Sequence, residues 1–441
     1  MNDPTAPRNP SRKQARKPAT KAYEESLRVA AAPAVDSSEE HVANGLESSG
    51  IAWVTTIFLV STTLLTLVGV PWYALAFGVH PLHWVIFGVL FVFTGMSITV
   101  GYHRLFTHRA YSASWPVKLF TLLFGGAAFQ MSALQWSSEH RYHHKYEDED
   151  GDPHDPHGIH HGFLWAHMGW LFVHVDPVLE MGNVGDLRRD PLVMWQHRNY
   201  LAVSIACGFF LPMAVATAAT SWLGGVWWVG LLGGFLIGAC ARIVAVHHIT
   251  WFINSLAHTI GRRPYDSSSS SRDSALLALL TFGEGYHNYH HAFQTDYRNG
   301  VRFWQFDPSK WVIWTLSKIG LARDLRRIPA ETIRMARIRE KGRQLERRLE
   351  MAREGNELLE TAQQMVQELE EKLEEMHLRC RRLLTQYSKE YSRRTNRRLE
   401  RPRQQLEELK AELQQVRREF RATVKEWQAA HRLALTLALT A

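Results

Sequence analysis

Long apolar runs alternate with polar segments along the first part of the chain. Two of these runs lie close together, at residues 51–77 and 82–102, and two more follow at about 201–223 and 226–246. Each reaches the roughly 20 residues that an α-helix needs to cross a bilayer. Soluble helices keep a polar stripe and these runs mostly do not, so the pattern predicts four transmembrane helices in two hairpins.

A fifth apolar run, at residues 115–136, is also long enough to span. A span here would place the polar segments on either side of it across the membrane from each other. We therefore expect this run to lie in the interface or to pack under a polar site, with Lys118 reaching toward water.

The chain changes character beyond about Pro329, where apolar residues recur with spacings of three and four. Such a seam predicts a coiled coil, and Pro402 should divide it into two helices, the second of which could fold back as a hairpin. The seam residues are Leu359, Ala362, Val366, Leu369, Leu373, Met376, Cys380, Leu383 and Tyr387, then Leu406, Leu409, Leu413, Val416 and Phe420.

These patterns divide the chain into three parts. Residues 1–48 are polar and basic and are expected to form a disordered tail without a cleavable targeting signal. Residues 49–325 form the transmembrane domain, and residues 326–441 form a basic helical coiled-coil tail. The fold class is therefore an all-α integral membrane protein with a cytosolic helical cap and a C-terminal coiled coil, which could join a partner or self-associate.

The formal charge of +8 belongs to the tail, because the stretch from Arg326 onward carries 27 Lys and Arg against 19 Glu. This location argues against a nucleic-acid partner and for a helical face that is either solvated or near anionic lipid. The links at 74–81 and 220–225 carry no Lys or Arg, so both termini are expected in the cytosol. Three widely spaced cysteines argue against a disulfide framework.

Most of the 23 histidines of the chain lie between His103 and His291, and several form short motifs that are expected on the same side of the membrane. Residues three and four apart share one face of a helix, whereas adjacent residues point about 100° away from each other. Each HxxHH motif can therefore serve two metal ions. The motif histidines are His103 and His108 of "HRLFTH", His140, His143 and His144 of "HRYHH", His258 of "NSLAH", and His287, His290 and His291 of "HNYHH".

Nine imidazoles and the amide of Asn254, four residues before His258, exceed what one metal ion accepts. Two metal ions are therefore implied, and iron with open positions for dioxygen is preferred to zinc, which takes four ligands. His103 and His108 lie five residues apart and need a helix end or local unwinding to converge. Nearby acids could orient the imidazole N–H groups, namely Glu139, Asp152, Asp155, Asp266 and Glu284.

Together, the four histidine motifs resemble those of the membrane fatty acyl desaturases of the stearoyl-CoA type, over about residues 51–314. The resemblance implies four transmembrane helices under a cytosolic cap, and a di-iron centre held by the nine histidines, with Asn254 acting through water. It also implies that O2 and two electrons are used to form a cis double bond, at the Δ9 position, in an acyl-CoA or another carrier-bound acyl chain. No catalytic side chain is expected beyond the metal ligands.

Four aromatic residues are candidate walls of an acyl tunnel: Trp136, Trp251, Phe87 and Phe91. Relatives that act on acyl-CoA have an arginine pair where this chain has His160 and His161, which are not expected to bind iron. The fused haem domain of some fungal relatives is not found here, so a separate electron donor, a ferredoxin or a reductase, is expected. A bacterial inner membrane is the favoured location.

Two alternatives remain open at this point. A di-iron hydroxylase of lipid or alkane chains would insert oxygen instead of forming an alkene. A membrane-anchored coiled-coil scaffold with a vestigial site would have no activity.

Overall fold

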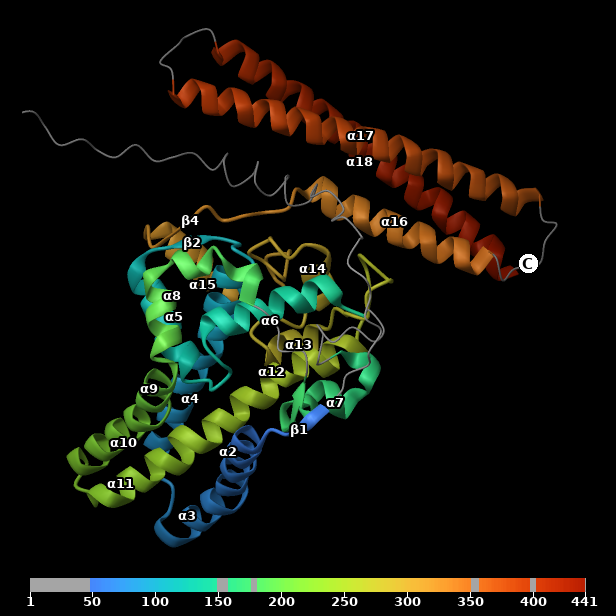
Figure 1. Cartoon of the computed structure of the whole chain (residues 1–441). Coiled ribbons are helices and arrows are strands. Elements are labelled where there is room, and N and C mark those ends of the chain that lie inside the picture. Colours follow the sequence, from blue (N-terminus) through green and yellow to red (C-terminus); the bar gives the residue numbers. More distant parts are fainter. Residues whose placement is uncertain (1–47, 149–157, 176–180, 350–356, 397–401, 441) are drawn as a thin grey trace, which may run out of the picture.

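The computed structural model describes residues 48–148, 158–175, 181–349, 357–396 and 402–440, and it is mostly helical (Figure 1). Most of the expected N-terminal tail, together with Asp152 and Asp155, lies outside these residues. Four helices are long and apolar enough to cross a membrane, which confirms the predicted number of spans: Trp53–Phe77, Pro81–Thr107, Tyr200–Trp222 and Trp227–Thr259.

Every span contains a segment of wider π-helix. The spans are built in order from α2 (Trp53–Leu64), η1 (Leu65–Gly69) and α3 (Val70–Phe77); α4 (Pro81–Met96) and η2 (Ser97–Thr107); α9 (Tyr200–Ile205), η7 (Ala206–Phe210) and α10 (Leu211–Trp222); and α11 (Trp227–Gly233), η8 (Gly234–Ala241) and α12 (Arg242–Thr259). In the first and third spans the π segment is followed by Pro71 or Pro212, which lacks the N–H that would continue the α-helical ladder.

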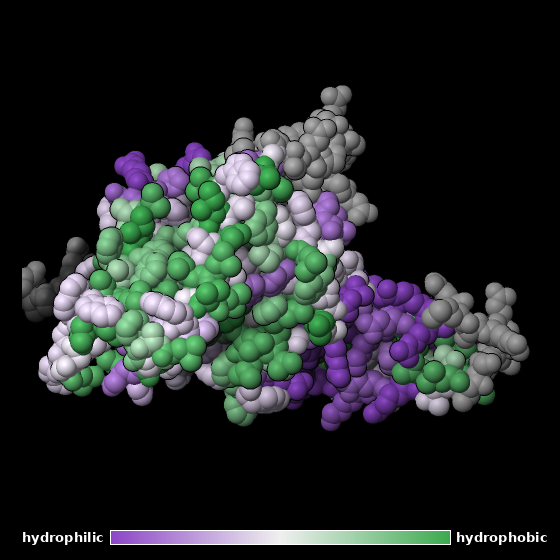
Figure 2. Space-filling view, turned by 90° about the horizontal axis from the view of Figure 1, so that it is seen from below, coloured by the Kyte–Doolittle hydropathy of each residue, from purple (hydrophilic) through white to green (hydrophobic). Residues whose placement is uncertain are grey.

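Large apolar side chains cover the outer faces of the spans. Val54, Leu75 and Trp222 are each at least 87% exposed, and such exposure suits contact with lipid and not with water. Figure 2 shows the end of the molecule where α3 and α11 lie, with a broad apolar surface, a large group of hydrophilic residues at the right and a smaller one at the upper left.

Arg242 lies fully buried inside the fourth span. Its guanidinium donates to the hydroxyl of Thr94 and to the carbonyls of Ala127, Gly208 and Gly238, at 3.0–3.2 Å. The carbonyl of Gly208 is the one that Pro212, four residues later, leaves without its helical donor. Arg242 therefore completes the hydrogen bonding of the interrupted third span and ties it to the second.

The fifth apolar run does not span, as the sequence predicts. Its helix α5 (Trp115–Gly126) ends early, and Phe129 and Met131 then turn the chain with φ of 55° and 70° before α6 (Ala133–Tyr146) begins. Helix α5 lies against η2, where a Cβ added to Gly101 would come within 2.4 Å of the Thr121 side chain.

Short helices complete the cap at one end of the spans (Figure 1). They are η3 (Ile159–His161), α7 (Phe163–His167), η4 (Gly169–Phe172), η5 (Met181–Val184), η6 (Leu187–Arg189), α8 (Pro191–Arg198), α13 (Ala275–Leu280), α14 (His287–Ala292) and α15 (Pro308–Lys318). Two small antiparallel pairs, which the sequence did not predict, join β1 (Ser48–Ile51) to β3 (Val173–Val175) and β2 (Ser112–Ala113) to β4 (Ala322–Arg323).

The tail consists of α16 (Ala330–Leu349), α17 (Glu357–Asn396) and α18 (Pro402–Thr440). Helices α17 and α18 lie side by side as a hairpin, with α16 between the hairpin and the cap (Figure 1). Most of the predicted seam is buried, including Val366, Leu373, Val416 and Phe420. The long-helix pattern and the fold-back at Pro402 are therefore confirmed, while supercoiling of a coiled coil stays a prediction.

Candidate metal centre

The nine motif histidines meet at the cap end of the spans and separate into two groups. Within each group, the possible ligand atoms lie within 4.8 Å of one another. The five-histidine cluster contains His103, His108, His140, His144 and His290. The four-histidine cluster contains His143, His258, His287 and His291. Asn254 lies one helical turn before His258 on α12.

Two HxxHH helices each contribute to both clusters. On α6, His140 and His144 enter the five-histidine cluster and His143 enters the other; on α14, His287 and His291 enter the four-histidine cluster and His290 crosses over. Residues four apart lie one above the other, whereas the residue between them points about 100° away. The predicted sharing of one triplet between two sites follows from this geometry.

His103 and His108 converge because the second span widens into a π-helix. On an α-helix, side chains five residues apart would point about 140° away from each other. Here the amide N–H of His108 donates to the carbonyl of His103 at 3.0 Å, five residues back. The wider turn, with His108 at the end of the helix, brings the two imidazole rings to a centroid separation of 4.7 Å, in agreement with the helix end or local unwinding expected from the sequence.

Several Nε2 atoms lie within hydrogen-bond distance of two other Nε2 atoms. Each imidazole nitrogen carries either one proton or one lone pair, so it can make only one of these hydrogen bonds. The Nε2 of His290 lies 2.9 Å from the Nε2 of both His103 and His144, and the Nε2 of His287 lies 3.1 Å from that of His258 and 3.0 Å from that of His291. The Nε2 of His108 is buried without a hydrogen-bond partner among the described residues. A cation between these nitrogens would satisfy all of them.

Burial, followed by repulsion from neighbouring imidazoles, lowers the pKa of five of these histidines well below its usual value: His108, His140, His144, His287 and His290. The neutral form of the ring is the form that binds metal through its free nitrogen. The donor set therefore fits metal ions in both clusters.

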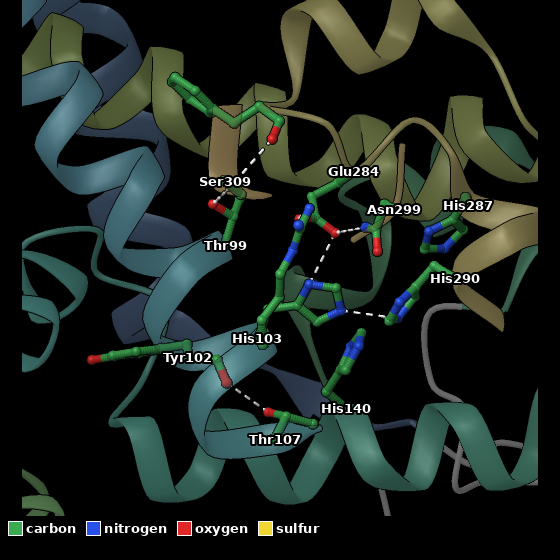
Figure 3. Close-up of polar contacts among 12 residues, drawn as sticks. Thr99, Tyr102, His103, Thr107, His140, Glu284, His287, His290, Asn299 and Ser309 are labelled. Carbon is green, nitrogen blue, oxygen red and sulfur yellow. Dashed lines mark hydrogen bonds and ion pairs between the residues drawn. The ribbon is translucent and has the colours of Figure 1, made fainter. Parts of the chain in front are cut away.

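Glu284 orients the five-histidine cluster from within the protein core. Its carboxylate accepts from Nδ1 of His103 at 2.9 Å and pairs with Arg104 at 2.8 Å, while Asn299 donates to it at 2.7 Å (Figure 3). Burial by itself raises the pKa of Glu284, but Arg104 and His103 outweigh it and lower the pKa to about 2. This contact fixes the His103 ring with Nε2 toward the cluster.

Glu147 performs the same task for the four-histidine cluster. It contacts Nδ1 of His291 and lies 3.7 Å from Nδ1 of His258. Although burial raises its pKa, the histidines lower it to about 2. The hydroxyl of Ser270 lies 2.7 Å from the same Nδ1 of His258, and Ser269 donates to Glu147 at 2.8 Å.

Of the acids proposed from the sequence, only Glu284 contacts an imidazole among the described residues. Burial raises the pKa of Glu139 to about 7, and Asp266 accepts from Ser268. The sequence reasoning missed Glu147 and Ser270. Glu147 is the first residue after α6, so helical spacing does not relate it to the histidines that it contacts.

A narrow, mainly apolar cavity of about 20 Å³ lies between the second and fourth spans. Phe91 lines it, and the other lining residues are Gly95, Ile98, Thr99, Val246, Ile249, Thr250, Ile253, Thr281 and Phe282. Phe87 is not among the lining residues and stacks on Phe91 with a centroid separation of 5.8 Å.

The two candidate tryptophans differ in their positions. Trp136 stacks on His140 at 4.8 Å, at the edge of the five-histidine cluster. Trp251 instead stacks on His247 and lies near His167, outside both clusters. His160 and His161 lie on η3 and belong to neither cluster.

Four membrane-spanning helices topped by two groups of converging imidazoles define an integral membrane protein with a histidine-rich site able to hold metal. Residues 79–318 match the family described as fatty acid desaturase. Because this match covers more than half of the chain, the protein belongs to that family.

Named relatives are similar to more than half of this chain. The chain is 40% identical over 260 residues to the "Probable acyl-CoA desaturase" of Schizosaccharomyces pombe, covering 59% of this chain and 52% of that protein. It is 36% identical over 283 residues to "Acyl-CoA desaturase 1" of Saccharomyces cerevisiae, covering 63% and 53%. "Stearoyl-CoA desaturase 5" of Bos taurus is 37% identical over 254 residues, covering 56% and 72%. The chain thus spans about half the length of the two yeast proteins.

Proposed function

We propose that this protein is an O2-dependent fatty acyl desaturase that forms a cis double bond, at the Δ9 position, in a saturated acyl chain. The observation that carries the proposal is the division of nine imidazoles into two groups with converging Nε2 atoms. Relatives named acyl-CoA and stearoyl-CoA desaturases support the same reaction.

Iron is the metal that suits this donor set and this chemistry. Zinc prefers four ligands and does no redox chemistry, whereas iron accepts imidazole and can keep positions open for dioxygen. His103, His108, His140, His144 and His290 would hold one ion, and His143, His258, His287 and His291 the other, with Asn254 acting on the second through water. When bound, the two irons supply the O2-dependent oxidation that removes hydrogen from unactivated carbon.

The chain itself positions the substrate. The cavity between the second and fourth spans has a mainly apolar lining that suits an acyl chain, and its volume of about 20 Å³ means that the lining side chains must move apart for a chain to enter. Phe91 at the wall of this cavity would limit the length of chain that enters, and Trp136 beside His140 would press the chain toward the five-histidine cluster. Trp251 and Phe87 would act through their neighbours.

We further propose the remaining assignments made from the sequence. The acyl chain arrives on CoA or another carrier, and two electrons arrive from a separate protein, a ferredoxin or a reductase. Both termini face the cytosol, on the side of the cap, and residues 49–325 form the catalytic domain. The bacterial inner membrane stays a prediction, and the relatives named above come from fungi and cattle.

Expression in a host that lacks its own desaturase tests this function. Fatty acid methyl esters from such cells should contain a product two hydrogens lighter than its saturated precursor. A product heavier by one oxygen would instead identify the alternative, a di-iron hydroxylase. Absence of iron from the purified protein, together with absence of any product, would favour the non-catalytic scaffold.

A further inference from the structure

Helix α16 of the tail presents two different stripes to its two neighbours. Met335, Ile338 and Leu345 are buried in an apolar cluster with the α17–α18 hairpin. Between them, Gly342 lets the hairpin approach, because a Cβ at this position would lie 2.4 Å from the carboxylate of Glu370. The spacing of three and four residues keeps this stripe on a single face.

The second stripe of α16 contacts the loop of residues 265–271 (the serine loop). Arg337 lies over the ring of Tyr265 at 4.7 Å and also donates to its hydroxyl. Glu340, only 1% exposed, accepts from the amide of Ser267 at 3.1 Å. Arg347 donates to the hydroxyl of Ser267 at 2.6 Å.

The inner side of the serine loop touches the four-histidine cluster. Ser270 contacts Nδ1 of His258 and Ser269 donates to Glu147, which in turn contacts His291. Asn288, directly after His287 on α14, donates to the carbonyls of Asp266 and Ser271 at 2.7 and 3.1 Å. The loop therefore connects α16 to the supports of three of the four histidines.

The five-histidine cluster has no such connection among the described residues. Its carboxylate, Glu284, is held by Arg104 and Asn299 inside the core. A displacement of α16 should therefore disturb one cluster and leave the other in place.

We propose that α16 is a positioning element for the four-histidine cluster, and that Glu340 is the residue through which it holds the serine loop. This inference rests on the proposed function, because it assigns the two clusters to two irons. The tail helices are thus part of the machinery that retains the second metal ion, and the α17–α18 hairpin keeps α16 against the loop.

The test compares full-length protein variants, purified in detergent and loaded with iron, by the rate at which a chelator removes the metal. Glu340→Ala removes the acceptor for Ser267 and should release one iron roughly 10-fold faster, the lower end of the effect typical for partners of metal ligands. The other iron should leave at the wild-type rate. Glu340→Gln keeps an acceptor oxygen and should largely restore slow release.

Two further variants complete the comparison. Glu407→Ala, at a residue of α18 that is 74% exposed, is the matched control and should behave as wild type. Arg347→Ala removes an exposed side chain, so this variant should fold even if Glu340→Ala does not. It should accelerate the release of the same iron by a smaller factor.

Equal acceleration of both irons, or none in either variant, would overturn the positioning role. Wild-type protein that binds no iron would instead overturn the proposed function itself, so the two failures are distinguishable.

Discussion

The five-histidine and four-histidine clusters are built by the same helices but are supported in different ways. Glu284 is 2% exposed and belongs to a buried network with Arg104 and Asp307. Glu147 is 12% exposed, lies at the end of α6, and depends on the serine loop for part of its hydrogen bonding. The core thus preorganises one cluster, whereas a loop held from outside organises the other.

This difference teaches that a two-metal site need not bind its two ions with equal strength. Ligands fixed by a buried ion-pair network lose little freedom on binding, so the ion is retained more firmly. The four-histidine cluster should therefore lose its metal first during purification or chelation.

The largest effect should come from removing one ligand of each cluster. His290→Ala and His287→Ala should each lower desaturation by more than about 100-fold, beyond the effect typical for partners of ligands. Iron titration should show weaker binding at the altered cluster of each variant, although four imidazoles remain in the His290 variant. Unchanged iron affinity together with unchanged desaturation in either variant would show that its histidine is not a ligand.

A second comparison replaces each of the two carboxylates by an amide. Glu284→Gln leaves buried Arg104 with half of its charge partners, so it should cost about 3–5 kcal/mol of stability as well as iron. Glu147→Gln should weaken iron binding by roughly 10–100-fold with little change in the melting temperature. Thermal unfolding and iron titration of both variants measure the two quantities. Equal loss of stability would contradict the difference in support.

The third comparison concerns the cavity between the second and fourth spans. Phe91→Ala should open the wall and admit longer acyl chains, because each added methylene in an apolar site is worth about 1–3 kcal/mol. Phe87→Ala, one turn away and behind Phe91, should leave the product lengths nearly unchanged. Gas chromatography of the methyl esters gives the chain lengths. A change of length in the Phe87 variant alone would show that Phe91 does not limit the length of the acyl chain.

The smallest effect should come from Ser270→Ala. Loss of one hydrogen bond to His258 is worth about 1 kcal/mol, so iron in the four-histidine cluster should bind roughly 5-fold more weakly. Ser317→Ala, which removes an exposed hydroxyl on α15, is the control. Unchanged iron affinity in the Ser270 variant would show that the serine loop does not support this cluster.

Local patterns in the sequence predicted the parts of the molecule that depend on local geometry. Apolar runs marked the four spans, and the spacing of His140, His143 and His144 predicted a triplet that serves two sites. These predictions hold because both depend on the regular pitch of a helix.

The features that depend on tertiary contacts could not be predicted in this way. The π-helix that joins His103 to His108 requires a hydrogen-bond register that no residue type announces. The role of Glu147, instead of Glu139, depends on where α6 ends and on which loop covers it. The pairing of β1 with β3 also joins segments far apart in the sequence.

Arg242 has a consequence for how the protein is assembled. A charged residue in the middle of a span raises the free energy of inserting that helix alone by roughly 2.5–3.5 kcal/mol. Its partners Thr94, Ala127 and Gly208 are made earlier in synthesis, on segments that must already be present when the fourth span arrives. The last helix to enter the bilayer is therefore stabilised by those before it, and membrane insertion and folding become one coupled step.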